Sequence, residues 1–179
     1  MRGFQLWINL PASEKMKPAG YRDIQADEIP VAALPGGGRV KVIAGTLDVD
    51  GAQTRGSVQG STTDALYLDV ELPAGGRFSQ PVASSYNAFV YPYEGEISVG
   101  PQGSAQQVET RSAALLSEGD RIDVTAGAAG ARFLVLAGRP LREPVVQYGP
   151  FVMNTREEIE QAVRDYQNGA LAAVPVASH

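Results

Sequence analysis

The sequence contains no cysteine, which excludes disulfide frameworks, thiolate catalysis, iron–sulfur clusters and cysteine-based zinc sites. It has a single histidine, His179, at the last of its 179 positions. A catalytic triad or a histidine metal site needs an imidazole that packed structure holds in place. A chain end rarely provides one. The sequence therefore predicts no catalytic residue, no metal ligand and no cofactor of this chain.

An excess of basic charge and long apolar runs are also missing. Fifteen Lys and Arg against twenty Asp and Glu give a net charge of -5, which does not favour binding to a phosphate backbone or to anionic lipid. No stretch approaches the roughly 18 to 20 apolar residues that span a bilayer, and residues 1–11 make a poor signal peptide. We expect a cytoplasmic protein that contacts neither nucleic acid nor membrane directly.

What the sequence does contain is short runs of alternating apolar and polar residues between turns. Its 20 glycines and 12 prolines predict many turns. The alternation has a period of two, as in strands with one buried face, and no helices are interleaved, which favours an antiparallel sandwich or barrel. The predicted strands are residues 4–10, 39–44, 65–72, 88–93, 96–100, 121–125 and 132–137.

One helix is predicted near the C-terminus, over residues 155–168. Asn154 or Thr155 can cap it, and Gly169 can end it. Apolar residues recur at helical spacing and form one stripe that needs an apolar surface to lie on. The stripe consists of Ile159, Ala162, Val163 and Tyr166.

The glycines of the β-rich region resemble the two sequence motifs of the cupin family. Counting from Gly76, the first motif closes on Gly95, and counting from Gly119, the second includes Gly127. The cupin ligand positions then hold Val82, Ser84, Ala88 and Gly130. Transition metals need imidazole and carboxylate ligands that converge on one point. The frame therefore predicts a cupin barrel without a metal.

Two longer segments resemble the pirin family of two-domain cupins. They are Gly3-Phe4-Gln5-Leu6-Trp7-Ile8-Asn9-Leu10-Pro11 and residues 137–155, which run from Ala-Gly-Arg-Pro-Leu to Met-Asn-Thr, and the resemblance covers about residues 2–169. In that family the N-terminal barrel carries iron on three His and one Glu, and the C-terminal barrel carries none. All of those ligands precede the segment matched by residues 3–7, so none has a counterpart here.

The resemblance implies an all-β, antiparallel, cupin-type jelly-roll barrel with one C-terminal α-helix. It assigns residues 1–11 to the strand that ends the N-terminal cupin, 12–38 to a linker, 39–150 to the C-terminal cupin barrel, 151–169 to the helix and 170–179 to a tail. Some pirins cleave quercetin as dioxygenases, and the mammalian protein is a nuclear transcriptional co-regulator.

Three functions follow as hypotheses. The first is a non-catalytic scaffold or binding module. The second is one part of a quercetin 2,3-dioxygenase-like, metal-dependent oxidoreductase whose catalytic barrel is supplied by another segment. The third is a barrel that binds a small ligand, with polar and aromatic residues lining its cavity. Those residues are Ser84, Tyr86, Asn87, Tyr91 and Tyr93. Pro92 between the two last tyrosines predicts an edge or a bulge.

An interaction surface is predicted where the N-terminal strand and the C-terminal helix present apolar side chains without the first barrel. A second copy of the chain or a partner protein would cover them, unless the segment packs on its own barrel. The residues are Phe4, Leu6, Trp7, Ile8, Leu10, Ile159, Val163 and Tyr166. Two acidic pairs, Glu94 with Glu96 and Glu118 with Asp120, flank glycines and predict tight turns rather than acid–base catalysis.

Overall fold

The computed structural model describes residues 3–18 and 20–171. These residues divide into two compact units, one formed by residues 24–140 and the other by the segments before and after them. His179 and most of the predicted tail lie outside the described residues. Within the described part of the chain, no helix is long and apolar enough to cross a membrane.

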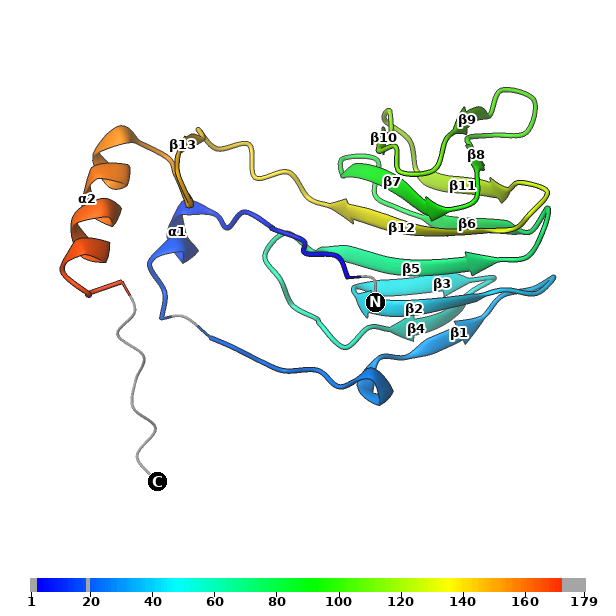
Figure 1. Ribbon diagram of the computed structural model, residues 1–179, viewed down its shortest axis with the longest axis horizontal. Helices are drawn as coiled ribbons and strands as arrows, with labels where there is room; N and C mark the ends of the chain where they lie inside the picture. Colours follow the sequence, from blue (N-terminus) through cyan, green and yellow to red (C-terminus); the bar gives the residue numbers. More distant parts are fainter. Residues whose placement is uncertain (1–2, 19, 172–179) are drawn as a thin grey trace. The chain divides into compact units, whose positions relative to one another are not determined.

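The larger unit is an antiparallel jelly-roll sandwich (Figure 1), which confirms the predicted fold class. It is open rather than a closed barrel, because each sheet ends in a strand with a neighbour on one side only. The six-stranded sheet has the order β1 (Val31–Ala33), β2 (Arg39–Ala44), β5 (Leu66–Leu72), β12 (Ala131–Gly138), β7 (Asn87–Glu94) and β10 (Ala114–Leu115). The four-stranded sheet has the order β6 (Arg77–Pro81), β11 (Arg121–Ala126), β8 (Ile97–Val99) and β9 (Gln106–Val108).

Alternation along the strands builds the core of the sandwich. In β5 every second side chain is buried, from Leu66 to Leu72, as expected for a strand with one face on the core. Phe133 of β12 is fully buried, and its ring meets that of Phe78 from β6 edge to face at 5.9 Å between centroids. A hairpin of β3 (Thr46–Val49) and β4 (Ala52–Arg55) adds Leu47 to the same core.

The smaller unit contains a helix on a hairpin. The strands β13 (Val146–Tyr148) and β14 (Phe151–Met153) pair with each other, and α2 (Arg156–Gln167) packs on both. The Thr155 hydroxyl accepts from the Glu158 amide at 3.2 Å, and the Glu158 carboxylate accepts from the Thr155 amide at 2.9 Å. This capping box satisfies amides that the first helical turn leaves free, and it confirms Thr155 as the cap.

One carboxylate joins the two chain segments of the smaller unit. Glu143 Oε2 accepts from the backbone amide of Ala12 at 2.8 Å and from Asn154 Nδ2 at 2.9 Å. Ala12 begins the short helix α1 (Ala12–Lys15). Residues from before and after the sandwich are therefore held together by one side chain.

Two predicted segments differ from the structure. Residues 4–10, predicted as a strand, form neither helix nor strand, and none of the described strands pairs with them. Alternating apolar residues favour an extended backbone, but a strand also needs a neighbour to complete its ladder. Residues 12–38, predicted as a linker, contain α1, a short 3-10 helix η1 (Ala26–Glu28) and β1, whose three residues are too few to show alternation.

Candidate functional site

The four cupin ligand positions do not converge in the structure. Val82 follows β6, and its amide donates to the Asp120 carbonyl at 2.9 Å, beside the start of β11. Gly130 lies in the turn after β11, beyond the opposite end of the same strand pair. The pair runs from Arg121 opposite Pro81 to Thr125 opposite Arg77, which is four steps of about 3.4 Å, or roughly 14 Å.

Gly95, which closes the first motif, instead makes a tight turn contact with Gly130 of the fourth ligand position. Gly95 has φ +69°, and a Cβ placed on it would lie 2.1 Å from the Gly130 carbonyl oxygen. Two turns of the sandwich therefore meet backbone to backbone at these glycines. This packing of turns requires a glycine at position 95, where the first motif ends.

The residue types at these positions do not fit a transition metal. Val82 and Ala88 are aliphatic and partly buried against the core, while Ser84 is an exposed turn residue with one hydroxyl. Iron requires several imidazole or carboxylate donors around one point. Among the described residues, no three His, Cys, Asp or Glu side chains gather in a way that could hold a metal ion.

The open end of the sandwich beside Val82 is closed by a buried glutamine. Gln80 is 4% exposed, and its side-chain oxygen accepts from the Asp48 amide at 3.0 Å. Its nitrogen donates to the Thr46 and Pro81 carbonyls at 3.3 and 2.9 Å. Both polar atoms of Gln80 are thus satisfied by the chain itself.

A small cavity of about 300 Å³ lies outside Gln80, with Val82 and Tyr86 in its lining. The Tyr86 hydroxyl donates to Asp64, and this hydrogen bond, with burial, raises the pKa of the phenol. Tyr86 alone of the five predicted cavity residues lines it.

The other four residues lie elsewhere. Ser84 and Asn87 are exposed. In β7, Val90 and Pro92 are buried, so Tyr91 and Tyr93 are on the outer face, because neighbouring side chains of a strand point to opposite faces. Pro92 lies where the register between β7 and β12 shifts, as the predicted bulge requires. The sequence shows the alternation but not which of its two phases faces inward.

The outer face of the six-stranded sheet carries a network of charged side chains. Glu71 accepts from Arg39 at 2.7 Å and lies 3.1 Å from Arg132, which is also 3.3 Å from Glu94. The hydrogen bond from Arg39, with the charge of both arginines, holds the pKa of Glu71 below its usual value. Glu94 is thereby an ion-pair partner, in keeping with a structural rather than catalytic role.

Tyr93 belongs to the same outer face. Its hydroxyl donates to Asp69 Oδ1 at 2.7 Å. Burial and this hydrogen bond raise the pKa of Tyr93, so the phenol stays protonated at neutral pH. Tyr93 is a fixed hydrogen-bond donor of the sheet, and it does not border a cavity of the interior.

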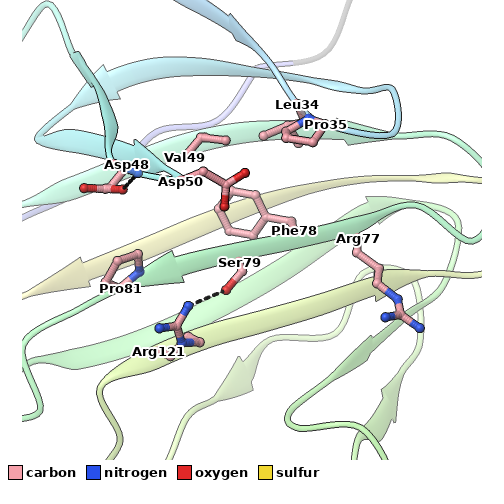
Figure 2. A pocket seen from close by; sticks show the side chains of 11 residues that line it. Leu34, Pro35, Asp48, Val49, Asp50, Arg77, Phe78, Ser79, Pro81 and Arg121 are labelled. Carbon is pink, nitrogen blue, oxygen red and sulfur yellow. Dashed lines mark hydrogen bonds between the residues drawn. The ribbon is translucent and has the colours of Figure 1, made fainter.

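A groove that sequence reasoning missed has a volume of about 430 Å³. Figure 2 shows the side chains that line it. Arg121 Nη1 donates to Ser79 Oγ at 3.2 Å, and Ser79 donates to Asp123 at 2.7 Å. Asp48 and Asp50 of the hairpin β3–β4 lie across from them (Figure 2). Alternation places Arg77 and Ser79 on one face of β6, but only the pairing of β6 with β11 brings Arg121 beside Ser79.

The predicted interaction residues all belong to the smaller unit. Trp7 is 69% exposed and Tyr166 is 70% exposed, whereas Ile159 is buried. Phe4, Ile8 and Leu10 are exposed, while Leu6 and Val163 are half-buried. A groove of about 440 Å³ lies between the N-terminal segment and the hairpin. Its apolar lining includes Trp7, Ile8, Leu10, Phe151, Val152 and Met153.

Within this unit the apolar stripe of α2 is divided. Ile159 and Ala162 are buried, but Tyr166 lies at the edge of the helix, where its ring meets Phe151 at 6.2 Å. The hairpin is thus the apolar surface that the helical stripe requires. Sequence reasoning did not predict this hairpin, because its two strands have three residues each.

Comparison with known proteins assigns the chain to a family. The model of the pirin C-terminal cupin domain matches residues 67–172. The chain belongs to the pirin family. This match begins within β5 and runs through the later strands of the sandwich, the hairpin β13–β14 and α2, and it confirms the resemblance seen in residues 137–155.

Individual pirins and related proteins are similar along nearly all of the chain. A Pseudomonas aeruginosa protein named putative quercetin 2,3-dioxygenase is 50% identical over 172 residues, which is 96% of this chain and 60% of that protein. Human pirin is 40% identical over 167 residues, 93% of this chain and 56% of its own. The crystal structure of a quercetin 2,3-dioxygenase from Acinetobacter baumannii superposes with a TM-score of 0.80 at 34% identity, covering 93% of this chain and 55% of that one.

The chain therefore spans somewhat more than half the length of the pirins that it matches. The activity in the names of the longer proteins is theirs.

Proposed function

We propose that this pirin-family chain is a binding module, or scaffold, that performs no metal-dependent chemistry of its own. The observation that carries this proposal is the satisfied interior of the sandwich. Phe78 and Phe133 fill it, and Gln80 closes its end with both polar atoms bonded to the chain. An active site needs polar groups that are left for a substrate.

The residues at the cupin ligand positions support the same proposal. They offer aliphatic side chains and one exposed hydroxyl, and Val82 and Gly130 lie beyond opposite ends of the strand pair β6–β11. These residues supply neither the donor atoms nor the geometry that iron requires. No step of a reaction is therefore assigned to this unit.

Elemental analysis tests the proposal directly. We expect the purified chain to hold no stoichiometric iron, copper, manganese, nickel or zinc after metal loading and gel filtration, because its sandwich lacks converging ligands. We also expect no consumption of quercetin or of oxygen. The longer Pseudomonas relative, prepared in parallel, provides the comparison. One tightly bound iron per chain, together with turnover of quercetin, would refute the binding-module proposal.

A second candidate is that this chain is one part of a quercetin 2,3-dioxygenase-like oxidoreductase. The names of the Pseudomonas and Acinetobacter proteins favour it, as does the share of those proteins that the chain covers. In that case the sandwich would support a metal-bearing barrel supplied by another segment. Turnover that appears only when the chain is mixed with a metal-bearing cupin partner would establish this role.

The exposed apolar side chains of the smaller unit support self-association. Trp7, Ile8 and Leu10 line one side of the groove against the hairpin, and each is at least 44% exposed. Exposed apolar residues that are contiguous mark interaction sites more often than isolated ones do. We infer that a second copy of the chain covers this groove.

Light scattering is expected to give twice the mass of one chain at micromolar concentration. Replacing both Trp7 and Ile8 with serine should shift the population to the monomer, because it removes the apolar surface of the groove. Tyr21→Ser is the control, since Tyr21 is 92% exposed and lies outside the groove lining. A monomeric parent chain at high concentration would contradict the proposed self-association.

A further inference from the structure

The sandwich is open along one seam, where the terminal strands of its two sheets face solvent. β10 ends the six-stranded sheet, and β9 ends the four-stranded sheet. Both lie in the green part of the unit, away from β1 and β2 (Figure 1). A cleft of about 550 Å³ lies along this seam, lined by residues of β8, β9, β10, β11 and the loops between them.

The floor of the cleft is apolar. Val108 is 9% exposed and Ile122 is 2% exposed, and both belong to the core. Val99, Ala114 and Leu116 pack against that core and also border the cleft. An occupant would therefore add its apolar side chains to an existing core surface, which needs no rearrangement of the sandwich.

Leu115 marks the edge of the same cleft. It belongs to β10, whose two residues pair with Val90 and Phe89 of β7 on one side only. Leu115 is 84% exposed, which is unusual for a leucine in a strand. A terminal strand presents unpaired backbone groups on its outer side, where an extended peptide can add as a further strand.

The rim of the cleft is acidic. Glu118, Asp120 and Asp123 line it, and Arg121 is the single basic residue of the lining, so three negative charges and one positive charge leave an excess of two negative charges. Arg121 donates to Ser79, a residue of the neighbouring groove in Figure 2. Within the described chain, neither Glu118 nor Asp120 forms an ion pair. These are the acidic residues that flank Gly119 in the sequence.

We propose that this cleft binds an extended peptide segment in which basic and apolar residues alternate, and that the segment adds to the edge of β10. The proposal rests on the chain being a binding module, and it names the partner's chemistry. Alternation at a period of two sends apolar side chains to the floor and basic ones toward the rim. A second copy is a poorer occupant, because the chain itself carries a net charge of -5.

Binding of a defined probe tests the proposal. We would titrate the chain into a fluorescein-labelled Lys-Val-Lys-Val-Lys-Val-Lys peptide and follow anisotropy at low ionic strength. Binding is expected to weaken with added salt, because the rim charges are exposed. The same peptide with glutamate in place of lysine should not bind. A peptide N-methylated at every residue should also fail, because it has no backbone N–H left to donate to a strand edge.

Charge variants locate the site. The double variant E118Q/D120N should weaken binding about tenfold, because each exposed charge pair contributes a few-fold at most. E157Q/E160Q removes the same charge from the exposed face of α2 and should leave binding unchanged. Equal loss in both double variants would show unspecific adsorption and overturn the proposal.

Two further outcomes would also overturn the proposal. Undiminished binding of the N-methylated peptide would show that no strand is added to β10. Self-association that E118Q/D120N abolishes would show that a second copy occupies the cleft instead. Neither result alters the expected metal content or turnover, so failure here is distinguishable from failure of the proposed function itself.

Discussion

Replacing Gly95 with alanine is expected to destabilise the sandwich by about 2–5 kcal/mol, or to prevent folding. The residue has φ +69°, a region in which an L-residue costs roughly 1–2 kcal/mol. The added Cβ would also lie 2.1 Å from the backbone oxygen of Gly130, which cannot rotate away as a side chain can. The turns after β7 and β11 would have to separate, and overpacking of this kind adds about 1–3 kcal/mol.

Urea denaturation followed by far-UV circular dichroism measures this loss. Two glycines of the same unit serve as controls. Gly103 also has positive φ, at +95°, but a Cβ on it would meet nothing within 4 Å. Gly103→Ala should therefore cost only the backbone strain, about 1 kcal/mol. Gly119→Ala meets neither obstacle and should be close to neutral. Equal stability of the Gly95 and Gly103 variants would show that the contact between the two turns does not contribute to the free energy of unfolding.

Replacing Phe133 with alanine is the second change expected to have a large effect, with a loss of about 3–5 kcal/mol of unfolding free energy. Phe133 is fully buried in β12, which lies between β5 and β7 in the middle of the six-stranded sheet. The substitution leaves a cavity that close-packed neighbours cannot fill, and it removes the edge-to-face contact with Phe78.

Two further variants separate the causes of that loss. Phe133→Leu keeps most of the apolar volume and loses the aromatic pair, so it should cost roughly 1–2 kcal/mol. Leu115→Ala, at a position 84% exposed in the same unit, should change stability by less than about 0.5 kcal/mol. The shift of the urea midpoint at constant slope reports each value. An Ala variant no less stable than the Leu variant would contradict the assignment of Phe133 to a rigid core.

Most of the sandwich could be predicted from the sequence, because its longer strands have one buried face. The prediction of residues 39–44 matches β2, and those of 65–72 and 121–125 differ from β5 and β11 by one residue at an end. Strands of two or three residues, such as β10, β13 and β14, were missed, since alternation cannot be recognised over so short a run.

The candidate sites were harder to predict, because they depend on which strands are neighbours. The frame of glycines gave Val82 and Gly130 as members of one site, yet the pairing of β6 with β11 places them at opposite ends. Tyr91 and Tyr93 lie on the same face of β7, as the alternation predicts. They were expected to line the interior, but that face is the outer one. Glu118 and Asp120 were predicted as turn residues only, and their position on a cleft follows from the open seam between β9 and β10.

The contact of Glu143 with Ala12 also fixes an order of events during synthesis. It joins positions 131 residues apart, whereas residues 24–140 form their unit from one continuous stretch. A ribosome releases the chain from its N-terminus, and domains fold as units when their residues have emerged. The sandwich can therefore form on the nascent chain. The apolar residues of the segment 3–10 cannot contact the hairpin until residues 141–171 have been translated. During that interval Trp7 and Ile8 lack the hairpin with which they share a groove, so their apolar side chains stay exposed to solvent.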